Sequence, residues 1–183
     1  AIYQPLIEEY QAFLEYLDLT QAKAKYAQNI QAILPTLKEE LQLQLIDAYH
    51  PVLYLNNLRK ERRTIPQTLS LTKKQRIIII SGPNAGGKSI TLKTVGLNQL
   101  MIQSGILIPV HPKSEVGFFD KIFTDIGDNQ SIENHLSTYS YRLKQMAYFL
   151  KNADEKSLLL VDEFGTGSDP VSYTHLTLPT TPY

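Results

Sequence analysis

The 183-residue sequence predicts an α/β fold, and three observations support this fold class. A run of four isoleucines, Ile77 to Ile80, is typical of a strand buried on both faces. A glycine-rich loop and an apolar-periodic segment from Ile90 to Ser104 follow it, which indicates a strand, a loop and then a helix. A second short apolar run, Ser157 to Val161, ends in two acids. A sheet flanked by helices accommodates all of these elements.

Residues 3 to about 31 are predicted to form a helix that serves as a connector. Apolar side chains recur there at spacings of one, three or four residues, while the acids lie off this stripe. The stripe comprises Leu6, Ile7, Tyr10, Phe13, Leu14 and Leu17. Because the stripe is narrow and Pro35 ends the pattern, we expect residues 1–40 to form an arm rather than a buried core helix.

Short strands are predicted on both sides of the isoleucine run, where apolar residues alternate with polar ones or cluster between turn residues. They are expected within residues 41–58, 69–71, 106–110 and 118–127. A bend is expected at His50–Pro51, and Gly105 should stop the helix that precedes residue 106. His50 alone is more typical of a structural histidine than of a ligand.

A later helix is predicted to begin at Ser137, after a polar and flexible segment from Asp125 to Glu133. Serine is a favoured N-cap residue, because its hydroxyl accepts from a free backbone N–H. The apolar residues at helical spacing are Leu143, Met146, Ala147 and Leu150. We therefore expect this helix to pack through one face.

The composition is that of an ordinary soluble globular protein, with 43% hydrophobic and 20% charged residues and zero formal net charge. Because the chain has no cysteine, disulfides and thiolate metal sites are excluded. No apolar run reaches the roughly 18 residues of a membrane span, and the N-terminus has no signal pattern. We expect a cytoplasmic protein without a membrane partner and, since residue 1 is not methionine, a fragment.

The neutral total conceals a basic segment between Arg59 and Arg76. Its seven bases and one acid, Glu61, give a net charge of +6 (7 − 1). The bases are Arg59, Lys60, Arg62, Arg63, Lys73, Lys74 and Arg76. Such runs are usually a solvated surface, and a phosphate or nucleic-acid role is the alternative.

The loop after the isoleucine run has the composition of a phosphate-binding loop. It consists of Gly82, Pro83, Asn84, Ala85, Gly86, Gly87, Lys88 and Ser89. Its glycines let the backbone turn N–H groups toward an anion, and the following helix adds its positive end. Lys88 would reach the β- and γ-phosphates, and the Ser89 hydroxyl would ligate Mg²⁺. The pattern predicts a nucleotide site; a glycine-rich turn that happens to contain a lysine is the alternative.

Asp162 and Glu163 are predicted to form the second half of this site. An acid at the end of a buried strand is costly unless a cation receives it, so Asp162 is expected to face the Mg²⁺ ion. Glu163 would orient or deprotonate the attacking water, and Asn84 is a weaker candidate for positioning it. Paired acids favour ATP hydrolysis; two acids that simply end a strand in solvent are the alternative.

Three stretches of the chain resemble the ATPase domain of the MutS family. They are Gly82–Leu97 (GPNAGGKSITLKTVGL), Asp120–Ser140 (DKIFTDIGDNQSIENHLSTYS) and Leu158–Pro170 (LLLVDEFGTGSDP). The motifs TDIGDNQSI and LST resemble the bacterial paralogue branch of the family more than the branch that contains the mismatch-repair protein. Asp47–Leu53 and Leu17–Ala27 resemble the segments before the ATPase core, so the likeness covers residues 1–170.

The resemblance implies an ABC-type ATPase fold, a P-loop NTPase that uses ATP and Mg²⁺ and works as a homodimer. Ser137 would face the γ-phosphate bound by the partner chain, unless it is only an N-cap, and Ile65 would pack on adenine. The family couples ATP turnover to clamping on nucleic acid. For this branch the implied partners are branched or mismatched DNA and the ribosome or rRNA. Its implied roles are recombination suppression and an endonuclease activity in a C-terminal Smr module.

The family pattern stops after Pro170. Residues 171–183 (VSYTHLTLPTTPY) resemble the translated read-through of a sequencing-library adapter, so we expect a non-native, disordered tail. His175 has the wrong context to replace the family's switch histidine. The expected organisation is therefore a helical connector over 1–40, a partial ATPase domain over 41–170 and the tail over 171–183.

Two other functions remain open on the sequence. A phosphotransferase with a phosphate loop would need an arginine-rich lid, but Arg142 is the only arginine between Ser89 and Asp162. A catalytically inactive interaction fragment would fold but would neither hydrolyse ATP nor transfer its phosphate.

Overall fold

The computed structural model describes residues 3–83, 86–127 and 135–163. The chain divides into two compact units, Ala1–Phe118 and Phe119–Tyr183, which are described separately below. None of the helices in the described part of the chain has the length and apolar character needed to cross a membrane.

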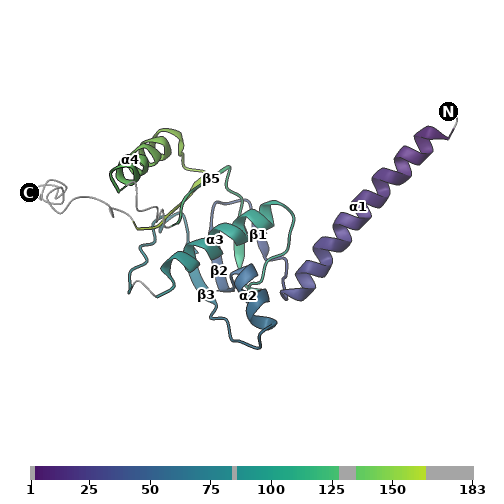
Figure 1. The fold of residues 1–183 in the computed structure, drawn as a ribbon, viewed down its shortest axis with the longest axis horizontal. Helices are drawn as coiled ribbons and strands as arrows, with labels where there is room; N and C mark the ends of the chain where they lie inside the picture. The colour runs from purple at the N-terminus through teal and green to yellow at the C-terminus, as the bar shows by residue number, and fades with distance from the viewer. Residues whose placement is uncertain (1–2, 84–85, 128–134, 164–183) are drawn as a thin grey trace, which may run out of the picture. The chain divides into compact units, whose positions relative to one another are not determined.

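The N-terminal helix α1, Gln4–Asn29, confirms the predicted helix, while its role as a connector stays a prediction. Pro5 lies in its first turn, where a missing N–H costs nothing. The apolar stripe from Leu6 to Leu17 is exposed along the helix, whereas Ala27 and Ile30 at its C-terminal end are buried. In Figure 1, α1 meets the rest of its unit at that end. The Lys23 Nζ donates to the Ser104 carbonyl oxygen there (2.9 Å).

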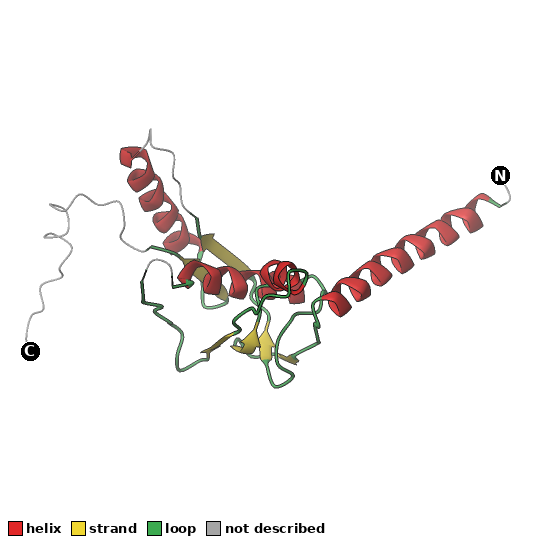
Figure 2. Cartoon of the chain, turned by 60° about the horizontal axis from the view of Figure 1, so that its bottom comes forward, coloured by secondary structure: helices red, strands yellow, loops and turns green. Residues whose placement is uncertain are grey.

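A four-stranded mixed sheet forms the centre of the first unit. Its strands are β1 (Thr36–Lys38), β2 (Leu43–Ala48), β3 (Gln67–Leu71) and β4 (Glu115–Gly117), in the order β1-β4-β2-β3. β1 runs parallel to β4, while β2 is antiparallel to both β3 and β4. Helix α3, Lys88–Gln103, lies against one face of this sheet (Figures 1 and 2). The buried apolar side chains of these elements include Leu43, Leu45, Ala48, Val95, Ile102 and Val116.

The strands expected within 41–58 and 69–71 are confirmed in part. β2 and β3 pair antiparallel with Leu45 opposite Leu69, and the register shifts between Leu45 and Ala48. Residues 51–58, however, form helix α2, Pro51–Leu58, so the prediction of strands there is wrong. The reason is local: Pro51 fits the first turn, and the His50 Nδ1 caps the helix by accepting from the Leu53 N–H (3.2 Å).

The prediction of a buried strand at Ile77–Ile80 is also wrong. These residues have no regular secondary structure, and Ile77 and Ile79 are 77% and 86% exposed. A strand needs at least one hydrogen-bonded neighbour to satisfy its backbone, and none of the described strands pairs with this segment. The isoleucine run therefore lacks the contacts that would make it a strand.

Residues 106–110 form no strand either, contrary to expectation. Ile108 makes an isolated antiparallel bridge with Ile33, and Pro109 has no N–H to continue a ladder. Gly105 stops α3 as predicted, with a φ of +67° that favours glycine.

The second unit is built on two parallel strands, β5 (Lys121–Asp125) and β6 (Ser157–Val161). The strand expected within 118–127 is thus confirmed. The strand predicted at the run into the two acids is also confirmed as β6, in which Leu158 and Leu160 are buried while Leu159 is 42% exposed.

Helix α4, His135–Asn152, packs on β5 through aromatic rings. The Phe123 ring centroid lies 5.2 Å from that of Phe149 and 6.1 Å from that of Tyr148. The helix begins two residues before Ser137, so Ser137 lies in its first turn and is not the residue that precedes it. The prediction that Ser137 is the N-cap is therefore wrong.

Candidate functional site

Two glycines fix the backbone of the phosphate loop. Gly87 has a φ of +82°, a left-handed conformation that other residues adopt only with strain. A Cβ on Gly86 would lie 2.9 Å from the Pro83 carbonyl oxygen, and the Gly86 N–H donates to that same oxygen (2.9 Å). The loop is therefore a tight turn that requires glycine at both positions.

Lys88 folds back over this turn. Its Nζ donates to the carbonyl oxygens of Gly82 (2.6 Å) and Pro83 (3.0 Å). The ammonium group thus lies at the mouth of the loop with two neutral acceptors. A phosphate oxygen carries full negative charge and forms a stronger, charge-assisted bond with the same donor.

The N-terminus of α3 fits an anion. Gly87 is its N-cap and supplies no side-chain acceptor, so the first-turn N–H groups, including those of Lys88 and Ser89, have no side-chain cap. The helix dipole adds a positive partial charge at this end. Together with the tight turn, these donors fit a phosphate group. Ser89 lies half-buried in the same first turn.

Three polar side chains anchor α3 to the sheet and hold the loop in place. The Thr91 hydroxyl contacts the Gln67 side chain at the start of β3 (3.1 Å). Asn98 donates to the Tyr49 carbonyl oxygen (3.1 Å), and Gln99 donates to that of Gly117 (2.8 Å). Both amides are buried, and the bond to Gly117 is buried as well, so Gln99 satisfies a backbone acceptor in the interior.

Ile65, the predicted adenine contact, belongs to the same unit as the loop. It is 75% exposed, and it lies two residues before Gln67, which contacts the first turn of α3. An exposed apolar side chain close in sequence to this contact is compatible with a contact to a base. The adenine role itself stays a prediction.

The predicted acids, Asp162 and Glu163, follow the carboxyl end of β6 in the second unit, and Asp125 ends the parallel strand β5 beside it. The strand register places Asp125 opposite Val161, and the Asp162 N–H donates to the Asp125 carbonyl oxygen (2.8 Å). The Asp162 Oδ1 accepts from the Glu163 N–H (3.0 Å). Glu163 has a φ of +49°, a conformation uncommon for a residue with a side chain.

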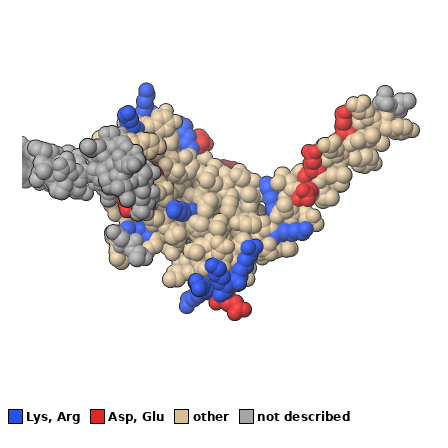
Figure 3. Space-filling model, in the orientation of Figure 1, with Lys and Arg blue, Asp and Glu red and all other residues tan. Residues whose placement is uncertain are grey.

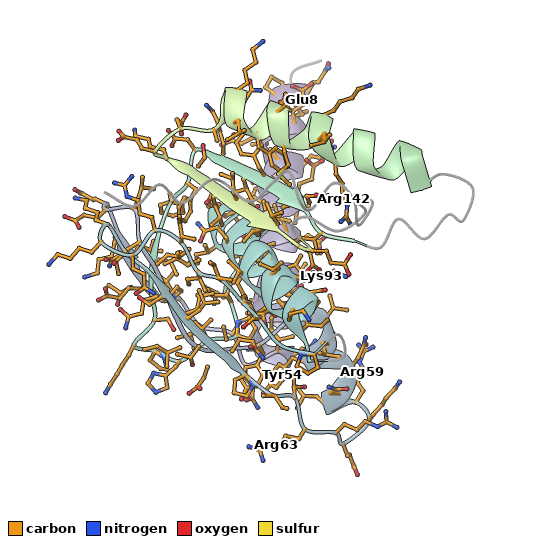
Figure 4. All side chains as sticks on the ribbon, turned by 90° about the vertical axis from the view of Figure 1, so that its left-hand side faces the viewer. Glu8, Tyr54, Arg59, Arg63, Lys93 and Arg142 are labelled. Carbon is orange, nitrogen blue, oxygen red and sulfur yellow. The ribbon has the colours of Figure 1, made fainter. Side chains whose placement is uncertain are left out.

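Arg142, on α4, holds Glu163. Its Nη1 donates to the Glu163 carbonyl oxygen (3.3 Å), and its Nη2 lies 3.7 Å from Oε2. The Arg142 side chain is only 15% exposed, and Figure 4 shows it on the side of α4 that faces the strands. The sequence interpretation gave no site role to Asp125 or Arg142. The sequence offered two signals for these residues. Both predicted strands end in acids, and the predicted helix between them contains one arginine.

Several predicted site residues lie outside what the structure describes. Asn84, Ala85, the Ser137 side chain and the 171–183 tail are outside the described part of the chain. Within the described ranges, no group of three or more His, Asp or Glu side chains lies close enough to hold a metal ion. Magnesium usually takes one or two carboxylates together with phosphates, so a nucleotide-bound ion does not require such a group.

A tight turn that depends on glycine before a helix, and a strand that ends in paired acids, are both typical of nucleotide-binding proteins. Residues 78–178 match the family described as MutS domain V, which is more than half of the chain. The chain therefore belongs to the MutS family, whose members are ATPases.

Within that family the chain is similar to proteins named Endonuclease MutS2. The relative from Ligilactobacillus salivarius is 47% identical over 157 residues, which is 86% of this chain and 19% of the relative. Those from Aquifex aeolicus and Staphylococcus epidermidis are 42% and 43% identical, over 91% and 84% of this chain and 21% and 19% of theirs. The chain thus spans about a fifth of the length of the curated relatives it matches.

Proposed function

We propose that this chain is the ATP-binding and ATP-hydrolysing module of a MutS-like nucleic-acid-binding protein. The observation that carries the proposal is the tight turn at Gly86 and Gly87 with the Lys88 ammonium over its mouth. An incoming triphosphate would replace the two loop carbonyls as the partner of Lys88 and accept from the first-turn N–H groups of α3. The family match supports the same reading.

Isothermal calorimetry with ATP and the Lys88→Ala variant tests this proposal. We expect measurable ATP binding by the unchanged chain and none by Lys88→Ala. Lys93→Ala is a matched control, because it removes a lysine from the same helix five residues on, and it should leave ATP binding intact. Retained affinity in Lys88→Ala would contradict the site.

The roles of Ser89 and Asp162 as Mg²⁺ ligands stay predictions from the sequence. When bound, the ion would neutralise phosphate charge and orient the triphosphate. Ser89→Ala and Asp162→Asn should each raise the Mg²⁺ concentration needed for tight ATP binding. If either variant binds ATP with an unchanged Mg²⁺ requirement, that residue is not a ligand.

For hydrolysis, we propose Glu163 as the residue that orients or deprotonates water and Arg142 as its positioning residue. The guanidinium contacts both the Glu163 carboxylate and its backbone, which restrains a residue with positive φ. Glu163→Gln should abolish phosphate release while ATP still binds. Arg142→Ala should lower kcat with little change in KM, and Arg142→Lys should recover part of it. A change confined to KM would exclude the positioning role.

The two alternatives make different predictions with the same variants. A phosphotransferase would transfer phosphate to an acceptor faster than to water. An inactive fragment would release phosphate equally slowly as the unchanged chain and as the Glu163→Gln variant. The finer features of the proposal are homodimerisation with Ser137 facing the partner's nucleotide, and binding to branched or mismatched DNA or to rRNA. The name of the relatives, Endonuclease MutS2, supports a nucleic-acid substrate for the longer protein.

A further inference from the structure

A strongly basic turn follows helix α2. Residues Arg59–Arg63, called the basic turn below, contain four bases and one acid, a net charge of +3 (4 − 1). All five residues are exposed. Figure 3 shows basic side chains gathered on the surface of the first unit, with acidic atoms beside them.

The basic turn has a defined backbone. The Arg62 N–H donates to the Asn57 carbonyl oxygen (2.8 Å), and Glu61 has a φ of +53°, so the chain reverses as it leaves α2. The Asn57 side chain then donates to the hydroxyl of Thr64, which is buried (3.0 Å). Figure 4 shows Arg59 and Arg63 projecting outward at this edge. The cations are therefore presented on an ordered support, which lowers the entropic cost of binding.

The structure splits the basic segment of the sequence into two groups. Strand β3, Gln67–Leu71, separates the basic turn from Lys73, Lys74 and Arg76. In the second group Lys73 is 3.5 Å from a Glu40 carboxylate oxygen, and Arg76 donates to the Lys73 carbonyl oxygen. Among the described residues, no carboxylate lies within ion-pair distance of the four bases in the basic turn.

Stabilisation of the C-terminus of α2 by cations explains only part of the charge of the basic turn. Arg59 is the C-cap residue of α2, where a cation stabilises the helix end. The dipole acts within the last helical turn, however, and Arg62 and Arg63 lie three and four residues beyond the cap. Their exposed charge has no structural partner in the described chain.

We propose that the basic turn binds the phosphodiester backbone of nucleic acid, at a site distinct from the phosphate loop. A polyanion with regularly spaced charges engages several cations at once and releases counterions, which suits four bases in five residues. Three of the four are arginines, whose planar guanidinium matches two phosphate oxygens. This inference rests on the proposed function, which places the chain on nucleic acid, and assigns the contact to named residues.

The test is the affinity of the full chain for a short random-sequence DNA duplex, measured by fluorescence anisotropy over a range of salt concentrations. Arg62→Gln/Arg63→Gln should weaken binding on the order of tenfold at low salt and reduce the slope of log affinity against log salt by about two. Lys73→Gln/Lys74→Gln is the matched control. It makes the same change in net charge at the other end of β3 and should have a much smaller effect.

Three outcomes would overturn the inference. They are an unchanged affinity and slope in Arg62→Gln/Arg63→Gln, an equal loss in the control, and no DNA binding by the unchanged chain at low salt. Binding that depends on Arg62 and Arg63 to poly-glutamate or to anionic vesicles, but not to DNA, would also overturn it. Such a result would favour a protein or a membrane partner. Calorimetry with ATP on the same variants separates this site from the proposed function: intact ATP binding leaves the ATPase proposal standing when the DNA result is negative.

Discussion

The phosphate loop and the acidic strand end belong to different units, and each is held in a different way. The loop is held by the helix that follows it, because α3 is anchored to the sheet by buried Asn98 and Gln99. The acids are held by the strand that precedes them, because β6 pairs with β5 along its whole length. The segment before the loop, Ile77–Ile80, has no such pairing with the described strands, and Ile77, Ile79 and Ile80 are exposed.

The comparison shows that a loop and a strand need different kinds of support. A tight turn and a helix N-terminus are specified by glycines and by hydrogen bonds between residues near in sequence. A strand exists only when another segment satisfies its backbone, whatever its own composition. The four isoleucines and Leu158–Val161 have similar composition, and only the second run has a partner.

The largest effect is expected in β6. Leu160→Ala removes a buried side chain and should lower the free energy of unfolding by about 2–5 kcal/mol. Leu159→Ala, in the same strand but 42% exposed, should cost clearly less. Denaturant unfolding together with hydrogen exchange of the β5 and β6 amides measures both. Equal costs would mean that the second face of β6 is covered as well.

In the first unit, Gln99→Ala should cost about 1–3 kcal/mol, because the buried Gly117 carbonyl oxygen loses its side-chain donor. Gln103→Ala is the control, since it removes a side chain that accepts from Gln99 and leaves the Gln99 donor to Gly117 in place. Denaturant unfolding measures the difference, and ATP affinity should fall with Gln99→Ala as α3 loosens. If the two variants have equal stability, Gln99 does not anchor α3.

The cap of α2 should make stability depend on pH. Burial, with a further contribution from the Lys93 charge, lowers the pKa of His50, although a hydrogen bond to its own backbone opposes this. A neutral His50 accepts from the Leu53 N–H, and a protonated one does not. Because the folded state disfavours protonation of His50, the contribution of His50 to the free energy of unfolding is fully present above about pH 6.5. It decreases as the pH falls below that value.

His50→Ala should cost about 1 kcal/mol at neutral pH through loss of the cap. His50→Asn should keep most of the cap, since asparagine is a favoured N-cap residue, and should remove this pH dependence. Thermal unfolding at pH 5 and pH 7 provides the measurement. A similar pH dependence in the wild-type chain and in His50→Asn would assign it to other groups.

The smallest effect is expected at Ile79. Because its side chain is 86% exposed, Ile79→Ser should change the free energy of unfolding by no more than about 0.5 kcal/mol. Ile108→Ala is the contrast, with a buried side chain of the same type and an expected cost of about 2–5 kcal/mol. A large loss for Ile79→Ser would mean that the isoleucine run is paired and buried in solution.

The sequence alone was sufficient for the elements whose signals are local. The 3.6-residue periodicity of α1 and α3, the stop at Gly105 and the glycines of the phosphate loop all act within a few residues. Family membership also followed from the motifs around Lys88 and Asp162. In the same way the run into Asp162 and Glu163 predicted β6, because a strand of four apolar residues bounded by acids is short and distinctive.

Only the tertiary structure decided which apolar runs are paired, and which long-range contacts support the site. It left Ile77–Ile80 exposed, made Pro51–Leu58 a helix and brought the Arg142 guanidinium to Glu163 across 21 residues of chain. It also separated the basic turn from a second basic group in which Lys73 pairs with Glu40. The physical reason is that strand pairing, burial and ion pairing depend on neighbours distant in sequence, whereas periodicity and turn chemistry depend on residues a few positions away.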